Sequence, residues 1–296
     1  MSNSESSNGS SDFVQRFLFE EHAVRGQWIK LSNSVQQLTA GHDYPAAVRQ
    51  QLFAAAAAAN LLVEILKFEG RMTLQVQSGG ELKLLLIQAN HQHEYRGVAR
   101  YGEAVPDSSN LKTLMPGAQM ALTIEPDQGK RYQGIVPMHD ESLAENLEAY
   151  FQQSEQLDTR LWLFSDEDSV VGLLLQAMPE HQHNSGLDHL AQLAATLTAE
   201  EALNLDVETL LHRLYHQDPL RLFEPSEIRY VCGCSRQKSS ASLALVPKEE
   251  LLEILEEDGQ VELTCDFCQT VYRYDSIDVE QVLANSGRDM QDDSLQ

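Results

Sequence analysis

The stretches VCGC (231–234) and TCDFC (264–268) contain all four cysteines of this 296-residue chain. They form a C-x-C…C-x-x-C pattern of two close pairs, Cys232 with Cys234 and Cys265 with Cys268. Four thiolates can make a closed tetrahedral site, the usual form of structural zinc. The pattern therefore predicts one Zn²⁺ per chain held by these four residues, in preference to an iron–sulfur cluster or to buried, unliganded thiols.

The sequence around the cysteines predicts a small unit of its own. A helix is expected over 247–258, with proline at its start and glycine directly after it. Two short strands, 261–265 and 269–275, flank the second cysteine pair, so that this pair lies at the tip of a hairpin, as in a zinc knuckle. A last helix is expected near 277–284.

Two interpretations of the cysteine site remain open from the residues alone. In the first, zinc is a static support for a unit too small to have much core. In the second, the site is a redox switch, because the two members of each pair are near enough in sequence to form a disulfide. Zinc joins position 232 to position 268, whereas a disulfide within a pair joins only neighbours and constrains the chain little. Oxidation would then unfold the unit and remove support from the segment before it.

The segment before the cysteine unit has an amphipathic, helical pattern. EHQHNSG (180–186) marks a boundary, and two helices are expected after it. Apolar residues recur at helical spacing over 187–197, TAEE (198–201) is a capping-box sequence, and Asp206 can cap a helix whose apolar residues follow the i, i+3, i+4, i+7 pattern. These helices either pack permanently on a neighbour or detach and expose their apolar faces.

The N-terminal part predicts an α+β domain with a largely antiparallel sheet. A helix is expected from Tyr44-Pro45 through the alanine run 54–59 to a stop at Gly70, close-packed because alanine lets another backbone approach. A second helix begins near Ser142. Strands are expected in 13–31 and at 72–77, 81–88, 95–100, 121–126, 131–138, 159–164 and 170–176.

The predicted organisation has five parts: a disordered tail (1–11), an α+β core domain (12–178), a helical linker (179–227), a zinc-binding redox-switch domain (228–285) and a polar tail (286–296). The longest apolar tract, Leu52 to Leu66, is interrupted by polar residues and is expected to be too short to span a bilayer. The polar start does not resemble a signal peptide. A cytoplasmic protein with reduced thiols is therefore expected.

The chain is acidic, with a formal net charge of −24. Residues 1–178 have 13 basic and 22 acidic side chains, and the remaining residues have 8 basic and 23 acidic ones. Such a surface repels phosphate backbones, which argues against nucleic acid as a partner. It also keeps a molecule with exposed apolar surface dispersed in solution.

The chain resembles the bacterial redox-regulated heat-shock holdase chaperone family of about 33 kDa. The resemblance rests on VCGCSR…TCDFC and, in the N-terminal part, on HDYP (42–45), LKFEG (66–70), YRGVA (95–99), YQGIV (132–136), YFQQSEQLDT (150–159) and GLLLQAMP (172–179). It covers about residues 12–285. Gln237-Lys238 stands where a more arginine-rich stretch is expected, a departure that does not touch the ligands.

This resemblance implies a reduced, zinc-bound form of low activity. Oxidation would join Cys232 to Cys234 and Cys265 to Cys268, release zinc, and unfold the zinc domain and the linker. The activated form, expected to be a homodimer, would hold unfolding client proteins without ATP. No enzymatic activity is expected, because CDFC is predicted between two strands, whereas the motif of a thiol oxidoreductase opens a helix after a strand. No membrane partner is expected, because the longest apolar tract is too short to span a bilayer.

Other constellations are less well supported. HRLYH (212–216) has two histidines at i, i+4, but Arg213 stands where the metalloprotease motif needs glutamate. The pairs His91/His93 and His181/His183 are expected in loops. The chain has no phosphate-binding glycine motif and no nucleophile elbow. The alternative function is a zinc-ribbon nucleic-acid-binding adaptor with a purely structural zinc, which needs more basic residues near the ribbon than the chain provides.

Overall fold

The computed structural model describes residues 12–66, 68–179 and 186–292, so the predicted tail 1–11, the stretch 180–185 and the last four residues lie outside the described residues. The chain forms two compact units, Met1–Thr39 with Asp43–Val231, and Ala40–His42 with Cys232–Gln296. The first unit contains two six-stranded sheets, and the second contains a two-stranded one. Apart from the parallel pair β12–β5, the strands pair antiparallel, which confirms the predicted α+β class.

The first sheet has the order β10-β1-β2-β9-β8, with β11 pairing with β1. Its strands are β1 (Phe13–Phe19), β2 (Val24–Leu31), β8 (Thr159–Ser165), β9 (Val170–Ala177), β10 (Leu220–Leu222) and β11 (Ser226–Glu227). β9 is buried along its whole length, because one face packs on the core helix and the other is covered by the linker helices. Burial of both faces explains its nearly continuous apolar sequence.

The second sheet has the order β12-β5-β4-β3-β6-β7. Its strands are β3 (Gly70–Gln77), β4 (Leu82–Asn90), β5 (Glu94–Tyr101), β6 (Gln119–Pro126), β7 (Tyr132–Pro137) and β12 (Arg229–Tyr230). The hairpin of β3 with β4 and the later strands agree with the strands expected from the sequence. The last strand of this sheet comes from the chain just before the first cysteine.

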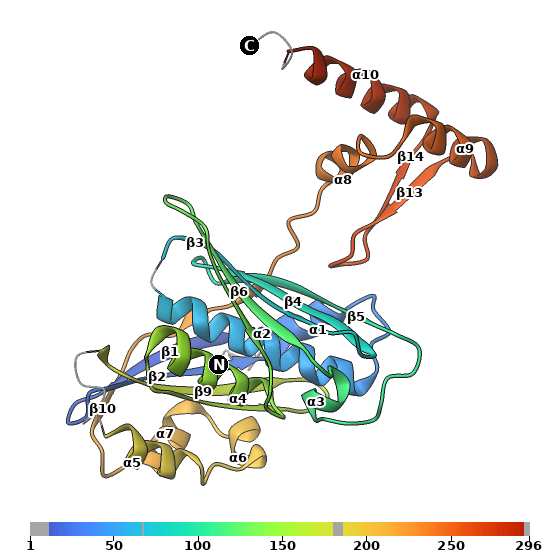
Figure 1. Cartoon of the computed structure of the whole chain (residues 1–296). Helices are drawn as coiled ribbons and strands as arrows, with labels where there is room; N and C mark the ends of the chain where they lie inside the picture. Colours follow the sequence, from blue (N-terminus) through green and yellow to red (C-terminus); the bar gives the residue numbers. More distant parts are fainter. Residues whose placement is uncertain (1–11, 67, 180–185, 293–296) are drawn as a thin grey trace, which may run out of the picture. The chain divides into compact units, whose positions relative to one another are not determined.

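Helix α2 (Ala46–Leu66) lies between the two sheets (Figure 1). Fifteen of its 21 residues are buried, including Ala55 to Ala59, so the small side chains let both sheets approach the helix. The helix is long and apolar enough to cross a membrane by composition, but 78% of its apolar window is buried in this fold. The tract judged too short from Leu52 to Leu66 is thus part of a longer, buried helix.

The first unit also contains shorter helices. Before residue 180 these are α1 (Asn33–Thr39), α3 (Leu111–Leu114) and α4 (Leu143–Tyr150), the last continued by a π-helical turn, Phe151–Glu155. Ser142 caps α4 through a capping box with Glu145, as its position before the predicted helix indicates.

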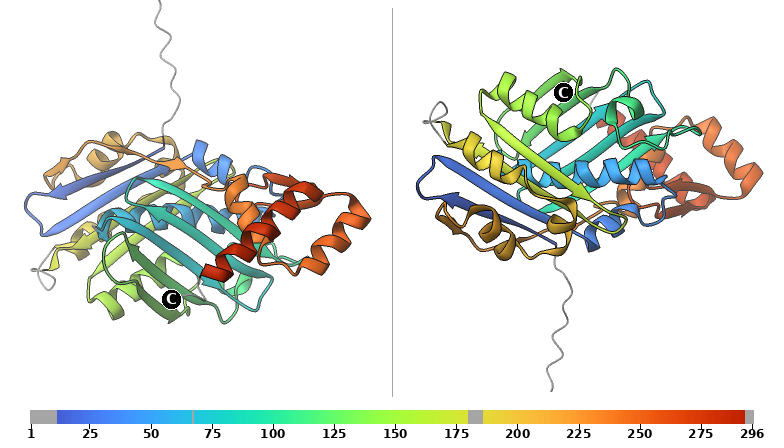
Figure 2. Two further views of the ribbon diagram at one scale, coloured as in Figure 1. Left: turned by 90° about the horizontal axis from the view of Figure 1, so that it is seen from above. Right: turned by 90° about the horizontal axis from the view of Figure 1, so that it is seen from below.

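Three linker helices cover the outer face of the first sheet: α5 (Leu187–Ala194), α6 (Ala199–Asn204) and α7 (Val207–Tyr215) (Figures 1 and 2). The prediction of two helices was wrong, because the capping box at Thr198 begins a separate short helix. The apolar cluster under these helices, here called the covered face, contains Phe17, Phe19, Val24, Trp28, Val171, Leu173, Leu175 and Ala177 from the sheet.

The predicted stop of α2 at Gly70 was also wrong. The helix ends at Leu66, and Gly70 is the first residue of β3, with φ of +143°. A side chain there would overlap the backbone of Glu125 and Pro126 in β6. The glycine is therefore required by close strand approach rather than by a helix end.

A glycine on the covered face gives a test of this packing. Gly26 lies under the ring of Phe17, where an added Cβ would overlap three ring atoms. We expect Gly26→Ala to lower the free energy of unfolding by about 1–3 kcal/mol, the usual cost of overpacking a core. Urea unfolding measures the change. Gly79→Ala is the control, because a Cβ at Gly79 meets nothing within 4 Å; equal effects of the two variants would contradict this packing.

The second unit is small. It contains α8 (Arg236–Leu243), α9 (Lys248–Asp258), the hairpin β13 (Val261–Thr264) and β14 (Val271–Tyr274), and α10 (Ser276–Asp292). α9 starts after Pro247 and ends at Gly259 in the left-handed conformation, as predicted. The final helix is longer than the predicted 277–284 and includes part of the expected polar tail.

Candidate metal and redox centre

The cysteines come from two turns of the second unit. Cys232 and Cys234 lie in the loop before α8, and Cys265 and Cys268 lie in the turn between β13 and β14. The backbone N–H of Cys265 donates to the Thr270 carbonyl (3.0 Å), and the N–H of Gln269 donates to the Cys265 carbonyl (2.9 Å). Gln269 has a left-handed φ of +57°. These contacts close the turn and point both of its cysteines to the same side.

The structure brings all four predicted residues together. Their Sγ atoms lie within 4.8 Å of one another, and none is in a disulfide. The Sγ atoms of Cys232 and Cys265 are 3.6 Å apart, and those of Cys234 and Cys268 are 3.4 Å apart. A tetrahedral ion with Zn–S bonds of about 2.3 Å separates its sulfurs by about 3.8 Å. The cluster therefore fits a metal ion of this size with little movement.

The sulfurs also have hydrogen-bond partners. The Tyr272 hydroxyl donates to Cys234 Sγ (3.1 Å), and the Thr270 hydroxyl lies 3.2 Å from Cys268 Sγ. Burial raises the pKa of Cys268, but hydrogen bonds from the Thr270 hydroxyl and N–H outweigh it and lower this pKa to about 7. Burial is also the main cause that raises the pKa values of Cys232 and Cys265. The pKa of the Cys268 thiol is therefore shifted in the opposite direction to those of Cys232 and Cys265.

The core beneath the cluster is very small. Its buried apolar residues are Leu243, Leu251, Val261, Tyr274 and Val279. Arg236 joins three parts of the unit: its guanidinium lies over the Tyr274 ring (4.4 Å to the centroid), donates to the Arg273 carbonyl (2.7 Å) and pairs with Asp278 (2.7 Å). These contacts were not predicted from the sequence, because the partners of Arg236 are some forty residues away. A metal cross-link is a natural support for so small a core.

Two of the histidine pairs named from the sequence, 212/216 and 91/93, do not form comparable sites among the described residues. His212 lies on α7 and His216 directly follows that helix, with ring centroids 6.2 Å apart and both side chains exposed. His91 Nδ1 accepts a hydrogen bond from the Gly70 N–H (2.8 Å), and His93 lies in the β4–β5 turn. His181 and His183 lie outside the described residues.

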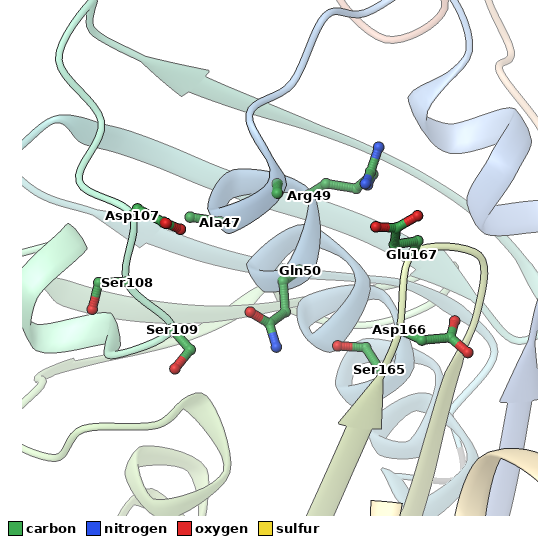
Figure 3. Close-up of a pocket in the computed structure, with 10 residues that line it drawn as sticks. Ala47, Arg49, Gln50, Asp107, Ser108, Ser109, Ser165, Asp166 and Glu167 are labelled. Atoms are coloured by element: carbon green, nitrogen blue, oxygen red, sulfur yellow. The ribbon is translucent and has the colours of Figure 1, made fainter. Parts of the chain in front are cut away.

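A pocket of about 440 Å³ lies at the start of α2 (Figure 3). Its lining comes from the first turns of α2, from 107–109 and from the turn after β8, and among the described residues it includes neither histidine nor cysteine. Asp166 Oδ1 accepts hydrogen bonds from the N–H groups of Asp168 and Ser169. The Asp166 carboxylate therefore stabilises the turn between β8 and β9.

Comparisons with known proteins agree with this architecture. A model of the family described as Hsp33 protein matches residues 12–275. The 33 kDa chaperonin of Shewanella loihica is 43% identical over 278 residues, which is 94% of this chain and 97% of that protein. The 33 kDa chaperonin of Pseudomonas syringae pv. tomato is 44% identical over 291 residues, 96% of this chain and 97% of that protein.

A solved structure shows the same fold. The crystal structure of the 33 kDa chaperonin of Thermotoga maritima matches with a TM-score of 0.81 and 20% sequence identity, over 93% of this chain and 99% of that one. Together with the match of the family model over nearly the whole chain, the sequence identities show that the chain belongs to the Hsp33 chaperonin family.

Proposed function

We propose that this protein is a redox-regulated, ATP-independent chaperone that holds unfolding proteins under oxidative and heat stress, and that it is not an enzyme. The observation that carries the proposal is the convergence of four thiols, from two separate turns, within 4.8 Å of one another. Family membership supports a chaperone, and the cysteine cluster supports a metal-dependent switch.

In the reduced form, Cys232, Cys234, Cys265 and Cys268 would bind one Zn²⁺ per chain. When bound, the ion supplies a cross-link between the loop before α8 and the β13–β14 turn. Structural zinc contributes about 10–16 kcal/mol of apparent binding free energy, whereas a core of this size contributes at most about 3–5 kcal/mol. The folded state of the second unit would therefore depend on the four thiolates.

Oxidation would convert the four ligands into two disulfides, Cys232–Cys234 and Cys265–Cys268. Each pair gives up two electrons and forms one S–S bond, while one peroxide molecule takes up the two electrons, breaks its O–O bond and leaves, with protons, as two waters. Sulfurs in disulfides no longer serve as thiolate ligands. The long-range cross-link is then replaced by two local ones, which constrain the chain little.

Loss of the second unit would weaken the linker. The helices α5, α6 and α7 have only 8, 6 and 9 residues, and helices of this length are unstable in water without tertiary packing. Their release from the sheet exposes the aromatic and aliphatic residues of the covered face. An apolar surface of this kind can bind unfolded chains, since these expose apolar segments.

The partners we propose are unfolded or oxidatively damaged client proteins, with a homodimer as the activated form in the cytoplasm. We propose no nucleic-acid or membrane partner. Two basic side chains near the cysteines are paired with acids: Arg236 with Asp278 at 2.7 Å, and Arg273 with Glu262 at 2.6 Å. This pairing reduces the positive charge available to phosphate groups.

One sample can test the switch. Zinc release, disulfide positions by mass spectrometry and suppression of client light scattering are measured before and after peroxide at raised temperature. We expect peroxide with heat to release one zinc per chain, to form bonds within each pair and to suppress client scattering, and a dithiol to reverse the change. Heat alone is the control.

The disulfide positions are decisive because close sulfur separations also run between the pairs, 3.6 Å from Cys232 to Cys265 and 3.4 Å from Cys234 to Cys268. Bonds across the pairs would keep the two turns joined, so finding them in the active protein would contradict the proposed unfolding. Client holding by the reduced, zinc-bound protein, unchanged by peroxide, would leave only a structural metal.

A further inference from the structure

A second group of metal-binding side chains lies in the first unit, where the linker meets the sheet. His22 is in the β1–β2 turn, His189 is on α5, and Asp218 follows α7. His22 Nε2 is 2.9 Å from Asp218 Oδ1, and His189 Nε2 is 3.2 Å from Oδ1 and 3.3 Å from Oδ2. One ligand atom from each residue lies within 4.8 Å of the others. The sequence positions gave no hint of this group, because nearly two hundred residues separate its first and last members.

These separations match those around a small divalent ion. Zinc bonds to histidine nitrogen and carboxylate oxygen are about 2.0–2.2 Å long, so two ligands of a tetrahedral ion lie about 3.3–3.5 Å apart. The nitrogen–oxygen distances of 2.9 and 3.2 Å need only a small expansion to admit the ion. Two imidazoles and one carboxylate form a donor set that suits zinc and similar transition metals.

The surroundings hold these ligands in place. Asp218 is only 8% exposed, and the His22 side chain is 25% exposed. Gly186, the residue before α5, has φ of +82° and lies against the His22 ring, where an added Cβ would overlap Nδ1. Phe19 contacts the rings of His22 and Tyr215 edge-on, with centroids 6.2 and 4.9 Å away. The His22 ring is thus enclosed by a glycine and an aromatic side chain.

The carboxylate is suited to bind a cation. The Asp218 oxygens lie within 3.3 Å of both imidazole nitrogens, so a bound ion would replace contacts that already converge on this carboxylate. The His189 side chain is 54% exposed, so an ion could enter from solvent on that side.

We propose that His22, His189 and Asp218 form a second binding site for one divalent transition-metal ion of the zinc type, separate from the four cysteines. Three protein ligands leave one coordination position for water. The ligands come from the β1–β2 turn, from α5 and from the end of the α7 segment, so the ion ties both ends of the linker helices to the first sheet.

Such a tie would act on the covered face. Nitrogen and carboxylate ligands form no disulfides, so peroxide at the cysteines leaves this site intact. Bound metal would therefore oppose release of α5–α7. A high zinc concentration would then raise the peroxide concentration needed for activation, a consequence that rests on the proposed function. If the site has to open before α5 detaches, metal at about 100 times its dissociation constant lowers the detached fraction about 100-fold.

The first test is metal binding to the full-length, reduced protein whose cysteines already hold zinc. Co²⁺ is titrated by calorimetry and absorption spectroscopy. We expect one further equivalent to bind without thiolate-to-cobalt charge-transfer absorption, and Asp218→Asn and His189→Ala each to weaken binding at least 10-fold. His189 is half exposed, so His189→Ala should fold even if Asp218→Asn does not.

His212→Ala is the matched control, because it removes an exposed histidine of α7 that lies outside the group; its binding should equal that of the unchanged protein. Absence of a further equivalent would overturn the proposal, as would equal binding by the unchanged protein and both site variants. In either case His22 and His189 would be hydrogen-bonded partners of Asp218 only.

The second test is hydrogen exchange of the reduced protein with and without Zn²⁺ at about 100 times its measured dissociation constant. We expect amides of 187–194 to exchange up to about 100-fold more slowly with zinc, and to show no change in His189→Ala. Equal exchange rates with and without zinc in the unchanged protein would overturn the tie. Neither test uses a client protein. If the metal binds but clients are not held, only the proposed function is contradicted. If clients are held but no metal binds at this site, only this inference is contradicted.

Discussion

Replacing Cys265 with serine is expected to unfold the cysteine unit under reducing conditions while both sheets of the first unit stay folded. The substitution removes one of the four thiols proposed to bind zinc, an ion that contributes about 10–16 kcal/mol at structural sites, and the five buried apolar residues described in the unit cannot compensate. Hydrogen exchange followed by mass spectrometry measures the effect. Amides of α9 and β13 should lose their protection, while those of α2 and β9 keep it.

The control for this variant is Ser242→Ala, a substitution of similar size at an exposed position of α8. It should leave zinc content and exchange unchanged. A Cys265→Ser protein with α9 and β13 still protected would mean that packing, rather than the cysteine cluster, holds the unit together.

Replacing Leu210 with aspartate is expected to make the reduced, zinc-bound protein active without an oxidant. Leu210 of α7 is 1% exposed and packs on the covered face. The substitution loses about 2–5 kcal/mol of packing and also places a carboxylate among apolar groups, which is unfavourable unless it is hydrogen-bonded. Release of the linker helices relieves both costs. Binding of an apolar dye measures the exposed apolar surface. Suppression of client light scattering measures whether this surface holds clients.

Thr209→Asp is the matched control, since it places the same charge at the neighbouring, exposed position of α7. It should behave like the unchanged protein. If Leu210→Asp binds the dye, keeps both sheets and still fails to hold clients, the covered face is not the client-binding surface.

The sequence predicted the main strands well because their signals are local. Alternating or continuous apolar runs between glycine-rich turns identified the hairpins β3–β4 and β8–β9. Helix α9 was equally clear, because Pro247 and Gly259 mark its ends. The core helix was recognised from its apolar content, although only the structure shows that it separates two sheets.

Elements that depend on distant residues were missed. Helix α1 is an example: the N–H groups of Ser32, Asn33 and Ser34, at its start, donate to the carboxylate of Asp12 at 2.8, 3.1 and 2.6 Å. Asp12 precedes β1 and β2 in the sequence, whereas α1 follows them, so no local sequence pattern reveals this stabilising contact. The two-residue strands β11 and β12 were missed for a related reason, since they exist only through pairing with β1 and β5.

In the candidate site, too, features with a local sequence signal were predicted and features that depend on distant residues were not. The convergence of all four cysteines was predicted from their spacing, because the ligands of structural zinc sites occur in close pairs. The hydrogen bonds of Tyr272 and Thr270 to the sulfurs follow from the register of β14 and could not be read from the sequence. The group of His22, His189 and Asp218 requires the linker to fold back on the first hairpin, which only the structure establishes.

The position of the linker in the chain has a consequence for how a client leaves. The helices α5–α7 follow directly after β9 in the sequence and cover that strand and its neighbours. A tethered segment meets its own binding surface at an effective concentration on the order of millimolar. Under the proposed function, a client bound to the covered face would compete continuously with these helices. Once reduction restored the folded form of the helices, the competition would favour release of the client, and no nucleotide would have to supply the energy.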